Sequence, residues 1–490
     1  MADAASTKLA SLAELEARLR QDLEWLCLPA KSWVPRRSVD GTAVTDVLIV
    51  GGGMCGLTAA GALKLLGVDN LRIVDRAPAG LEGPWITFAR METLRSPKDL
   101  TGPCLGLPAL TFRAWFEAQF GLDAWQMLDK IPREQWMDYL VWYRRVLGLE
   151  IDSLTTVREI RPASEGLFEV LLTTPSGDER ALARHVVLAT GRDGGGQPQV
   201  PALARTLDRR RWAHSADDID FAALRGKRVA VVGAGASAMD NAATALEAGA
   251  ARLDLFVRRR DLPRINKLTG VSSPGLVHGF ASLPDDWKWR INTYAAATQT
   301  PPPRSSTLRV SRHDHAHFHL GSPVERIDER GDALVVHTPR GRYPVDFIVF
   351  ATGFSTELEV RPELAAFVDN IRLWKDAFDA RGEPHNTELA NSPYLGYAFE
   401  CQEKVEGRTP ELSRLHLFNY SATASAGKLS GDIPAVTTGA KRLAQGIAAS
   451  LLHDDCDAHY AALQAFDKPE LFGDEWQDDD EDDGEVVNVA

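Results

Sequence analysis

Two stretches of the chain follow the same plan of apolar strands and small-residue helices. The first begins with the apolar run 44–50, passes through a glycine-rich turn into a helix pattern over 57–66, and ends in a strand pattern over 71–74. The second repeats this order over residues 228–257. Short apolar strands that alternate with helices are typical of parallel sheets covered by helices. The pattern therefore predicts an α/β fold built from two such units.

The two ends of the chain have patterns of their own. Leucines recur every three or four residues between Leu9 and Leu26, which predicts an amphipathic helix over 7–28 that packs on the body of the protein. Nine acidic residues and no basic residue lie between Asp474 and Glu485, and they carry most of the net charge of −13. Such a run predicts a solvated, disordered tail, and it makes nucleic acid an unfavourable partner.

The first glycine-rich turn has the spacing of a dinucleotide-binding site. Gly51, Gly53 and Gly56 follow the strand without a gap, and Asp75 ends the next strand 19 residues after the third glycine. The glycines allow a tight turn and let the backbone approach a pyrophosphate at a helix N-terminus, where amide groups are unpaired. Asp75 can accept hydrogen bonds from both ribose hydroxyls, and the adjacent Arg76 is a further cofactor-binding candidate. The first unit is predicted to bind a dinucleotide with free ribose hydroxyls.

The second turn has the same spacing but ends in a different residue. Its candidate cofactor-binding residues are Gly233, Gly235, Ser237 and Ala238. Arg258 stands 20 residues after the last of these, where the first unit has its acid, and Arg259 follows it. A guanidinium pairs well with a ribose 2′-phosphate, which a carboxylate would repel. The second unit is therefore predicted to prefer NADPH, and a solvated basic loop is the alternative interpretation of the arginines.

Two strands that end in Ala-Thr-Gly, at residues 185–191 and 347–353, bracket the second unit. Glycine allows close backbone passage, so we interpret both as crossings between domains, with the second nucleotide domain inserted into the first. The last helix of the first domain is expected to start near Asp432 and Ile433, which are also cofactor-binding candidates, and to run through Leu452. The predicted boundaries are 1–43 for an N-terminal helix and linker, 44–200 with 345–460 for the first nucleotide domain, 201–344 for the inserted domain, and 461–490 for the acidic tail.

These features together resemble the class B flavoprotein monooxygenases, which include flavin-containing, N-hydroxylating and Baeyer–Villiger enzymes. The resemblance covers about residues 44–455 and includes the stretch 350–354 (FATGF). Residues 82–85 (EGPW), with Trp85, are similar to a Gly-Gly-x-Trp stretch near the flavin, and residues 131–140 are similar to another region of the family. The resemblance implies two nested Rossmann-like domains, with FAD in the first and NADPH in the second.

The implied activity is that of an NADPH-dependent flavin monooxygenase. NADPH reduces FAD, a flavin C4a-hydroperoxide passes one oxygen of O₂ to a small organic substrate, and the other oxygen leaves as water. The family's Phe-x-Gly-x-x-x-His signature is reduced here to His214-Ser215, and Asp218 stands at the spacing of a tryptophan of the Baeyer–Villiger enzymes. We therefore expect N- or S-oxygenation, with Baeyer–Villiger oxidation of a ketone as one alternative. A non-catalytic dinucleotide-binding redox sensor is the alternative from a different class.

Two cations on the segment 93–100 are the candidate catalytic residues. Arg95 stands where flavin-containing monooxygenases have an asparagine that contacts the flavin. Lys98 lies in a stretch similar to the one that holds a substrate carboxylate in N-hydroxylating enzymes. The resemblance implies that Lys98 binds a substrate anion and that Arg95 steadies negative charge near the flavin. The alternative interpretation is that both side chains lie at a turn, where they face solvent or pair with nearby acids.

Other features narrow the class of protein. Five scattered cysteines without a C-x-x-C pair argue against a disulfide framework, a cysteine zinc site and a disulfide reductase. No apolar run approaches the ~18 residues of a membrane span, and no signal-peptide pattern is present, so we expect no membrane partner and a cytoplasmic location. Alternating histidines between His313 and His319 are interpreted as a surface strand, and no metal is predicted. The substrate and a possible homo-oligomer are left open.

Overall fold

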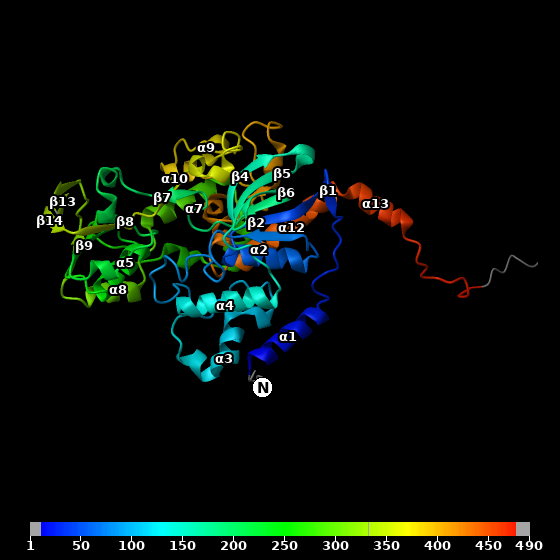
Figure 1. Cartoon of the computed structure of the whole chain (residues 1–490), viewed down its shortest axis with the longest axis horizontal. Helices are drawn as coiled ribbons and strands as arrows, with labels where there is room; N and C mark the ends of the chain where they lie inside the picture. Colours follow the sequence, from blue (N-terminus) through cyan, green and yellow to red (C-terminus); the bar gives the residue numbers. More distant parts are fainter. Residues whose placement is uncertain (1–10, 332, 477–490) are drawn as a thin grey trace, which may run out of the picture.

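The structure, a computed structural model that describes residues 11–331 and 333–476, places two sheets side by side along its long axis (Figure 1). In the described part of the chain, the first sheet has a parallel core in the order β3-β2-β6-β17, and β1, β5 and β4 extend it with antiparallel pairing. Its strands are β1 (Arg37–Val39), β2 (Thr42–Val50), β3 (Leu71–Val74), β4 (Thr156–Pro162), β5 (Phe168–Thr174), β6 (Gly177–Leu188) and β17 (Leu415–His416).

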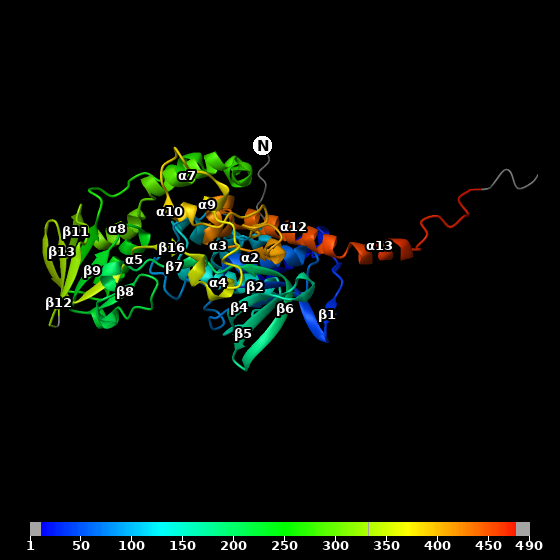
Figure 2. The ribbon, with the colours of Figure 1, turned by 90° about the horizontal axis from the view of Figure 1, so that it is seen from above.

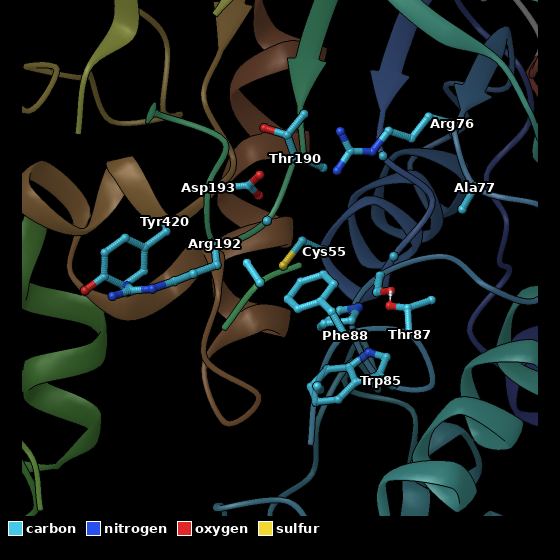
Figure 3. Close-up of a pocket in the computed structure, with 18 of the residues that line it drawn as sticks. Cys55, Arg76, Ala77, Trp85, Thr87, Phe88, Thr190, Arg192, Asp193 and Tyr420 are labelled. Carbon is cyan, nitrogen blue, oxygen red and sulfur yellow. Dashed lines mark hydrogen bonds between the residues drawn. The ribbon is translucent and has the colours of Figure 1, made fainter. Parts of the chain in front are cut away.

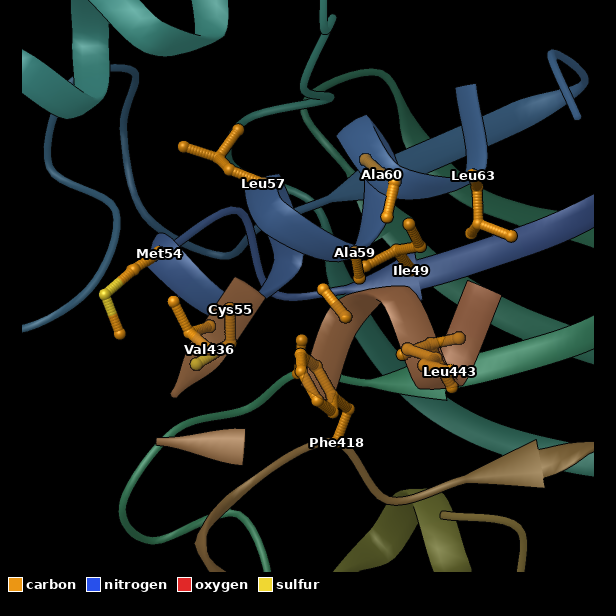
Figure 4. Close-up of a cluster of buried hydrophobic side chains, with 14 of the residues drawn as sticks. Ile49, Met54, Cys55, Leu57, Ala59, Ala60, Leu63, Phe418, Val436 and Leu443 are labelled. Carbon is orange, nitrogen blue, oxygen red and sulfur yellow. The ribbon is translucent and has the colours of Figure 1, made fainter. Parts of the chain in front are cut away.

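The helix α2 (Met54–Leu65) joins β2 to β3 and packs against α12 (Val436–Asp454). Residues 54–63 of α2 are all buried, and Figure 4 shows its small side chains gathered with Ile49 of β2 and Leu443 of α12 in one apolar cluster. A Cβ at Gly56 would lie 1.8 Å from the carbonyl oxygen of Gly51, so only glycine fits there. This packing fixes the N-terminus of α2 against the end of β2, as the glycine spacing predicts.

The second sheet is entirely parallel and belongs to the inserted domain. Its order is β11 (Ala316–Leu320), β10 (Arg252–Val257), β9 (Arg228–Val232), β15 (Phe347–Phe350) and β8 (Trp212–His214). The helices α5 (Ala236–Glu247) and α8 (Arg304–Ser311) pack against one another, and α5 covers β9 and β10. An antiparallel sheet follows, formed by β12 (Arg326–Arg330), β13 (Ala333–Thr338) and β14 (Gly341–Val345). The predicted α/β fold with one nucleotide domain nested in another is confirmed.

The return crossing lies later in the chain than the sequence indicates. β15 pairs with β8 and β9, so residues 347–350 belong to the second sheet and the predicted boundary at 345 is too early. The crossing follows Phe350, where β16 (Phe354–Thr356) pairs antiparallel with β7 (Gly196–Pro198) of the outgoing crossing. An apolar strand ending in Ala-Thr-Gly has the same pattern in either sheet, and only its pairing shows to which sheet it belongs.

The ends of the chain depart from the expected boundaries in two places. The expected linker contains the hairpin β1–β2, because Asp40 and Gly41 both adopt the positive φ angles of a two-residue hairpin turn. The N-terminal helix is α1 (Leu12–Trp25), which buries Leu15 and Leu19 and packs on α3 (Phe112–Met127), as predicted, while residues 1–10 lie outside the described residues. The helix α13 (Cys456–Ala465) extends into the predicted tail and projects from the body (Figure 2), and residues 477–490 are likewise outside the description.

The remaining helices lie around the two sheets (Figures 1 and 2). They are α3 (Phe112–Met127), α4 (Arg133–Val146), α6 (Pro274–Gly279), α7 (Asp285–Thr298), α9 (Trp374–Ala377), α10 (Thr387–Ala390) and α11 (Thr423–Ala426). Among the described residues, none of the helices combines the length and apolar character needed to cross a membrane. His317 and His319 lie on β11, whereas His313 precedes it, so the alternating histidines do not share one strand face.

A buried pair of histidines joins β6 to β17. Nδ1 of His416 lies 2.9 Å from the carbonyl oxygen of Ala398, so it donates there, and its Nε2 accepts from Nδ1 of His185 at 3.1 Å. Both rings are buried in the first sheet. Burial lowers the pKa of His416 to about 4 and holds the pKa of His185 well below its usual value. The pair is therefore neutral in the folded protein at neutral pH.

We expect the free energy of unfolding to fall by about 3 kcal/mol as the pH drops from 7 to about 4 because of His416 alone, and His185 adds to this fall. The unfolded chain takes up protons on both imidazoles near pH 6.5, whereas in the folded chain His416 takes one up only near pH 4 and the pKa of His185 also lies well below its usual value. Stability from the pair is thus complete above the usual histidine pKa and is lost as the pH falls towards the folded value. Urea unfolding at several pH values should show a flatter profile for His416→Gln than for the wild type, and equal slopes would contradict this role.

Candidate active site

A cavity of about 760 Å³ lies at the carboxyl ends of the parallel strands of the first sheet and reaches the second domain. It extends from the first glycine turn at residues 51–55, past the loop 81–91, to the N-terminal part of α5. Its size is in the range of small-molecule and cofactor sites, and ligands of α/β sheets bind at this edge. One continuous cavity therefore connects the two predicted nucleotide sites.

The first turn provides a cradle for a pyrophosphate. The N-terminus of α2 has no side-chain cap, so its amide groups are available to an anion. A Cβ built on Gly53 would have its nearest neighbour 3.7 Å away, at Cα of Gly83, so the space in front of this glycine is free. The carboxylate of Asp75 accepts from the backbone of Gly52 and of Ala77, each at 2.7 Å. Its remaining lone pairs are left for ribose hydroxyls, and these features fit FAD.

A loop over the first turn forms one wall of the cavity. Trp85, Thr87 and Phe88 line the cavity from this loop, and Figure 3 shows them grouped below Cys55. Nη1 of Arg133 donates to the carbonyl oxygens of Trp85 and Ala89, at 3.1 and 2.6 Å, and so fixes the loop on the start of α4. Both family-like stretches, residues 82–85 and 131–140, thus meet at this wall.

The second turn offers a matching cradle in the inserted domain. The N-terminus of α5 also has no side-chain cap, and a Cβ on Gly235 would meet nothing within 4 Å. Ser237 lines the cavity, whereas Gly233, Gly235 and Ala238 are not among its lining residues. Arg258 is exposed and has no ion pair among the described residues, whereas Nη2 of Arg259 donates to the carbonyl oxygen of Ala297 at 3.0 Å. The free arginine beside an open helix N-terminus fits NADPH, and it favours Arg258 over Arg259 as the phosphate ligand.

The two catalytic candidates both lie off the lining of the main cavity. Nη2 of Arg95 donates to the carbonyl oxygen of Pro301 at 2.7 Å, which connects the first domain to the segment before α8. Burial lowers the pKa of Arg95, and the charge of Asp432 opposes this shift. Burial likewise raises the pKa of Asp432, against the charges of Lys428 and Arg95. Asp432 follows Gly431 of the cavity lining, so the charge of Arg95 acts on a residue next to that wall.

Lys98 has a different environment from the one its resemblance implies. Its ammonium donates to the carbonyl oxygens of Trp125, at 2.7 Å, and of Leu128, and it lies 5.1 Å from the ring centroid of Trp125. These groups form the C-terminal end of α3, where a cation is favoured by the helix dipole. In this structure Lys98 therefore caps the helix α3, and its role as a ligand of a substrate carboxylate stays a prediction. A short motif places the residue on the segment but does not determine where its side chain points.

Several cavity residues were not predicted. Arg192 and Asp193 follow the first Ala-Thr-Gly crossing, and Tyr420 comes from the turn after β17. Arg192 and Asp193 could have been identified from the sequence, because they are two charged residues directly after the glycine of the first crossing strand. Ser215 also lines the cavity, next to the buried His214, so the reduced His-Ser signature does face the site.

Two open helix N-termini around one cavity, with an acid at the first ribose position and an arginine at the second, define a flavoprotein that binds two dinucleotides. Residues 114–309 match the sequence model of the L-lysine 6-monooxygenase/L-ornithine 5-monooxygenase family. The chain is 41% identical over 465 residues to the FAD-dependent urate hydroxylase of Xanthomonas campestris pv. campestris. The aligned region covers 94% of this chain and 98% of that enzyme. The chain therefore belongs to the family of FAD-dependent monooxygenases that includes this urate hydroxylase.

Solved structures show the same fold at low sequence identity. Ornithine hydroxylase from Pseudomonas aeruginosa aligns with a TM-score of 0.65 and 18% identity, over 84% of this chain and 99% of the solved one. Ornithine N-hydroxylase from Kutzneria, solved with reduced FAD, NADP⁺ and L-ornithine, aligns with a TM-score of 0.65 and 18% identity, over 83% and 99%. The predictions of an enzyme, of the monooxygenase class and of FAD and NADPH as cofactors are confirmed. Family membership is also consistent with the predicted N-oxygenation.

Proposed function

We propose that this enzyme hydroxylates urate or a closely similar planar, anionic oxopurine. The observation that carries the proposal is the 41% identity to a urate hydroxylase along nearly the whole of both chains. The cavity supports it, because a cation and an aromatic side chain, Arg192 and Phe354, line the same cavity as the two nucleotide cradles. One oxygen atom of O₂ enters the substrate, the other leaves as water, and NADPH supplies two electrons.

The chain's own residues bind and orient the reactants. When bound, FAD supplies the redox chemistry that connects NADPH, O₂ and the substrate. The N-terminus of α2 and Asp75 would hold FAD, and the N-terminus of α5 with Arg258 would hold NADPH. Trp85 and Phe88 form one wall of the cavity that holds the two cofactor sites, and this wall limits the access of water to the cavity. The predicted cytoplasmic location and the possible homo-oligomer stay predictions.

A substrate panel tests the proposal. Urate, L-ornithine, L-lysine, a thioether and a ketone would each be added to the holoenzyme with NADPH, while NADPH oxidation, hydrogen peroxide and a mass gain of one oxygen are recorded. We expect urate to accelerate NADPH oxidation and to gain oxygen with little peroxide. Oxygenation of ornithine or lysine alone would instead favour amine N-hydroxylation, which the match of residues 114–309 supports as the second candidate. Ester formation from the ketone would favour the Baeyer–Villiger alternative.

Arg95→Met is expected to divert NADPH electrons to hydrogen peroxide while the KM for the substrate stays unchanged. The reason is that its charge acts on Asp432, which follows Gly431 of the cavity lining, and that it connects the two domains through Pro301. Peroxide formed per NADPH consumed measures the effect, and Arg95→Lys, which keeps the charge, is the matched control. Unchanged coupling in the methionine variant would show that Arg95 has no part in the reaction.

Lys98→Met is expected to lower the stability by about 1–2 kcal/mol and to leave the KM for the substrate unchanged. The substitution removes a cation from the C-terminus of α3 and leaves the carbonyl groups of Trp125 and Leu128 without this donor. Thermal unfolding of the holoenzyme measures the loss, and Lys98→Arg should restore most of it. A higher KM at wild-type stability would contradict the capping role and support the substrate contact that the resemblance implies.

A further inference from the structure

A stacked pair of side chains, Arg192 on Tyr420, forms one end of the cavity. Cζ of Arg192 lies 3.2 Å from the ring centroid of Tyr420 and 5.7 Å from that of Phe354. Figure 3 shows the Arg192 side chain reaching across to the face of Tyr420, while Asp193 points the other way, towards Thr190. One face of the guanidinium is thus covered by the ring, and its N–H groups remain available at the edge.

The backbone beneath this pair is rigidly built. The amide of Tyr420 donates to the carbonyl oxygen of Gly191 at 3.1 Å. The side-chain amide of the buried Asn419 donates to the carbonyl oxygen of Leu188 and to Oγ1 of Thr190, each at 3.2 Å. These contacts connect the end of β6 to the turn after β17. Arg192 and Tyr420 are therefore positioned by the first sheet itself, beside the strand that carries the first glycine turn.

Arg192 carries a charge without a partner in the described structure. It forms no ion pair with any described carboxylate, although its side chain is accessible from the cavity. Desolvation by nearby protein atoms lowers the pKa of Arg192 to about 10, and the charge of Glu388 opposes this shift, although the residue as a whole is exposed. An exposed arginine that lines a cavity and forms no ion pair can bind an anion through its N–H groups without giving up a contact to a carboxylate.

The other arginines that line the cavity either form hydrogen bonds within the protein or lie at the end assigned to the FAD ribose. Arg361 pairs with Glu363 through two hydrogen bonds of 2.9 and 2.6 Å. Arg90 donates to the carbonyl oxygens of Thr87 and Asp217, at 2.7 and 3.4 Å. Arg76 follows Asp75 at the end of the cavity assigned to the FAD ribose. Among the described arginines that line the cavity, Arg192 combines an aromatic stack with a guanidinium that forms no ion pair.

We infer that Arg192, stacked on Tyr420, is the residue that binds the negatively charged edge of the substrate. The inference rests on the proposed function and names the residue that recognises the oxopurine anion. An ionised ring nitrogen and its neighbouring carbonyl oxygen present two acceptors side by side, which match the fork of a guanidinium. The Tyr420 ring keeps the guanidinium plane fixed, and Phe354 provides an apolar neighbour for a flat ring.

Equilibrium titration of the oxidised holoenzyme with urate, followed by the flavin absorbance, tests the inference. We expect Arg192→Met to raise the Kd for urate about 10- to 100-fold, with wild-type FAD content, melting temperature and KM for NADPH. Arg192→Lys should recover only part of the affinity, because an ammonium lacks the fork. Tyr420→Phe keeps the stack and should bind as the wild type does. Arg381→Met, at an exposed arginine paired only with Asp379, is the matched control and should change nothing.

The outcomes separate this inference from the proposed function. A wild type that neither binds urate nor oxidises NADPH in its presence overturns the proposed function and the inference with it. A wild type that oxygenates urate, together with an Arg192→Met variant of equal affinity, overturns the inference alone. A selective loss of FAD or a higher KM for NADPH in Arg192→Met assigns the residue to a cofactor phosphate and also overturns it. A uniformly methylated, uncharged oxopurine should bind wild type and Arg192→Met equally.

Discussion

Gly53→Val is expected to give a folded protein that contains essentially no FAD. The space in front of Gly53 is open towards the cavity, with the nearest atom 3.7 Å from a Cβ at this position, so the protein itself tolerates a side chain. A valine there would occupy the place where the backbone approaches the pyrophosphate of a dinucleotide. The purified variant should lack the flavin absorbance of the wild type, and circular dichroism should show unchanged secondary structure.

Two other glycines serve as controls for this variant. Gly235→Val makes the same change in the second turn, where a Cβ would meet nothing within 4 Å, so this protein should keep FAD and lose NADPH oxidation. Gly56→Val should fail to fold, because a Cβ there would lie 1.8 Å from the carbonyl oxygen of Gly51. A Gly53→Val protein with normal flavin content would show that FAD does not bind at the first turn.

Arg258→Ala is expected to weaken NADPH by about 10- to 100-fold and to leave NADH nearly unchanged. A charge-assisted contact to a phosphate contributes about 1.5–3 kcal/mol, and only NADPH carries the 2′-phosphate. Arg258 is exposed at the end of β10 and has no ion pair among the described residues, so its removal breaks no visible contact within the protein. The measurement is kcat/KM for each coenzyme with the same substrate.

Arg259→Ala is the control because its guanidinium already donates to the carbonyl oxygen of Ala297. It should have the smaller effect on coenzyme choice, and the double variant should resemble Arg258→Ala. Equal losses for NADPH and NADH in Arg258→Ala would show that the residue does not contact the 2′-phosphate. A native preference for NADH would contradict the assignment of both arginines.

The sequence alone determined the two nucleotide units, because their signals are local. A strand, a glycine turn, a helix and a second strand are contiguous in the chain, and the spacing of Gly51, Gly53 and Gly56 follows from the geometry of that turn. The same holds for the residues that end the second strand of each unit, Asp75 and Arg258. The nested order of the domains could also be predicted, because two similar crossing strands bracket the second unit.

Only the tertiary structure decided how distant segments meet. Tyr420 reaches Arg192 because the turn after β17 docks on the end of β6, more than 200 residues earlier in the chain. Lys98 points to α3 rather than to the cavity, and β15 joins the second sheet rather than the first. A sequence pattern specifies the period and the apolar face of a segment, but several partners satisfy that requirement equally well. The choice among them depends on the packing of the whole chain, which sets strand neighbours and side-chain directions together.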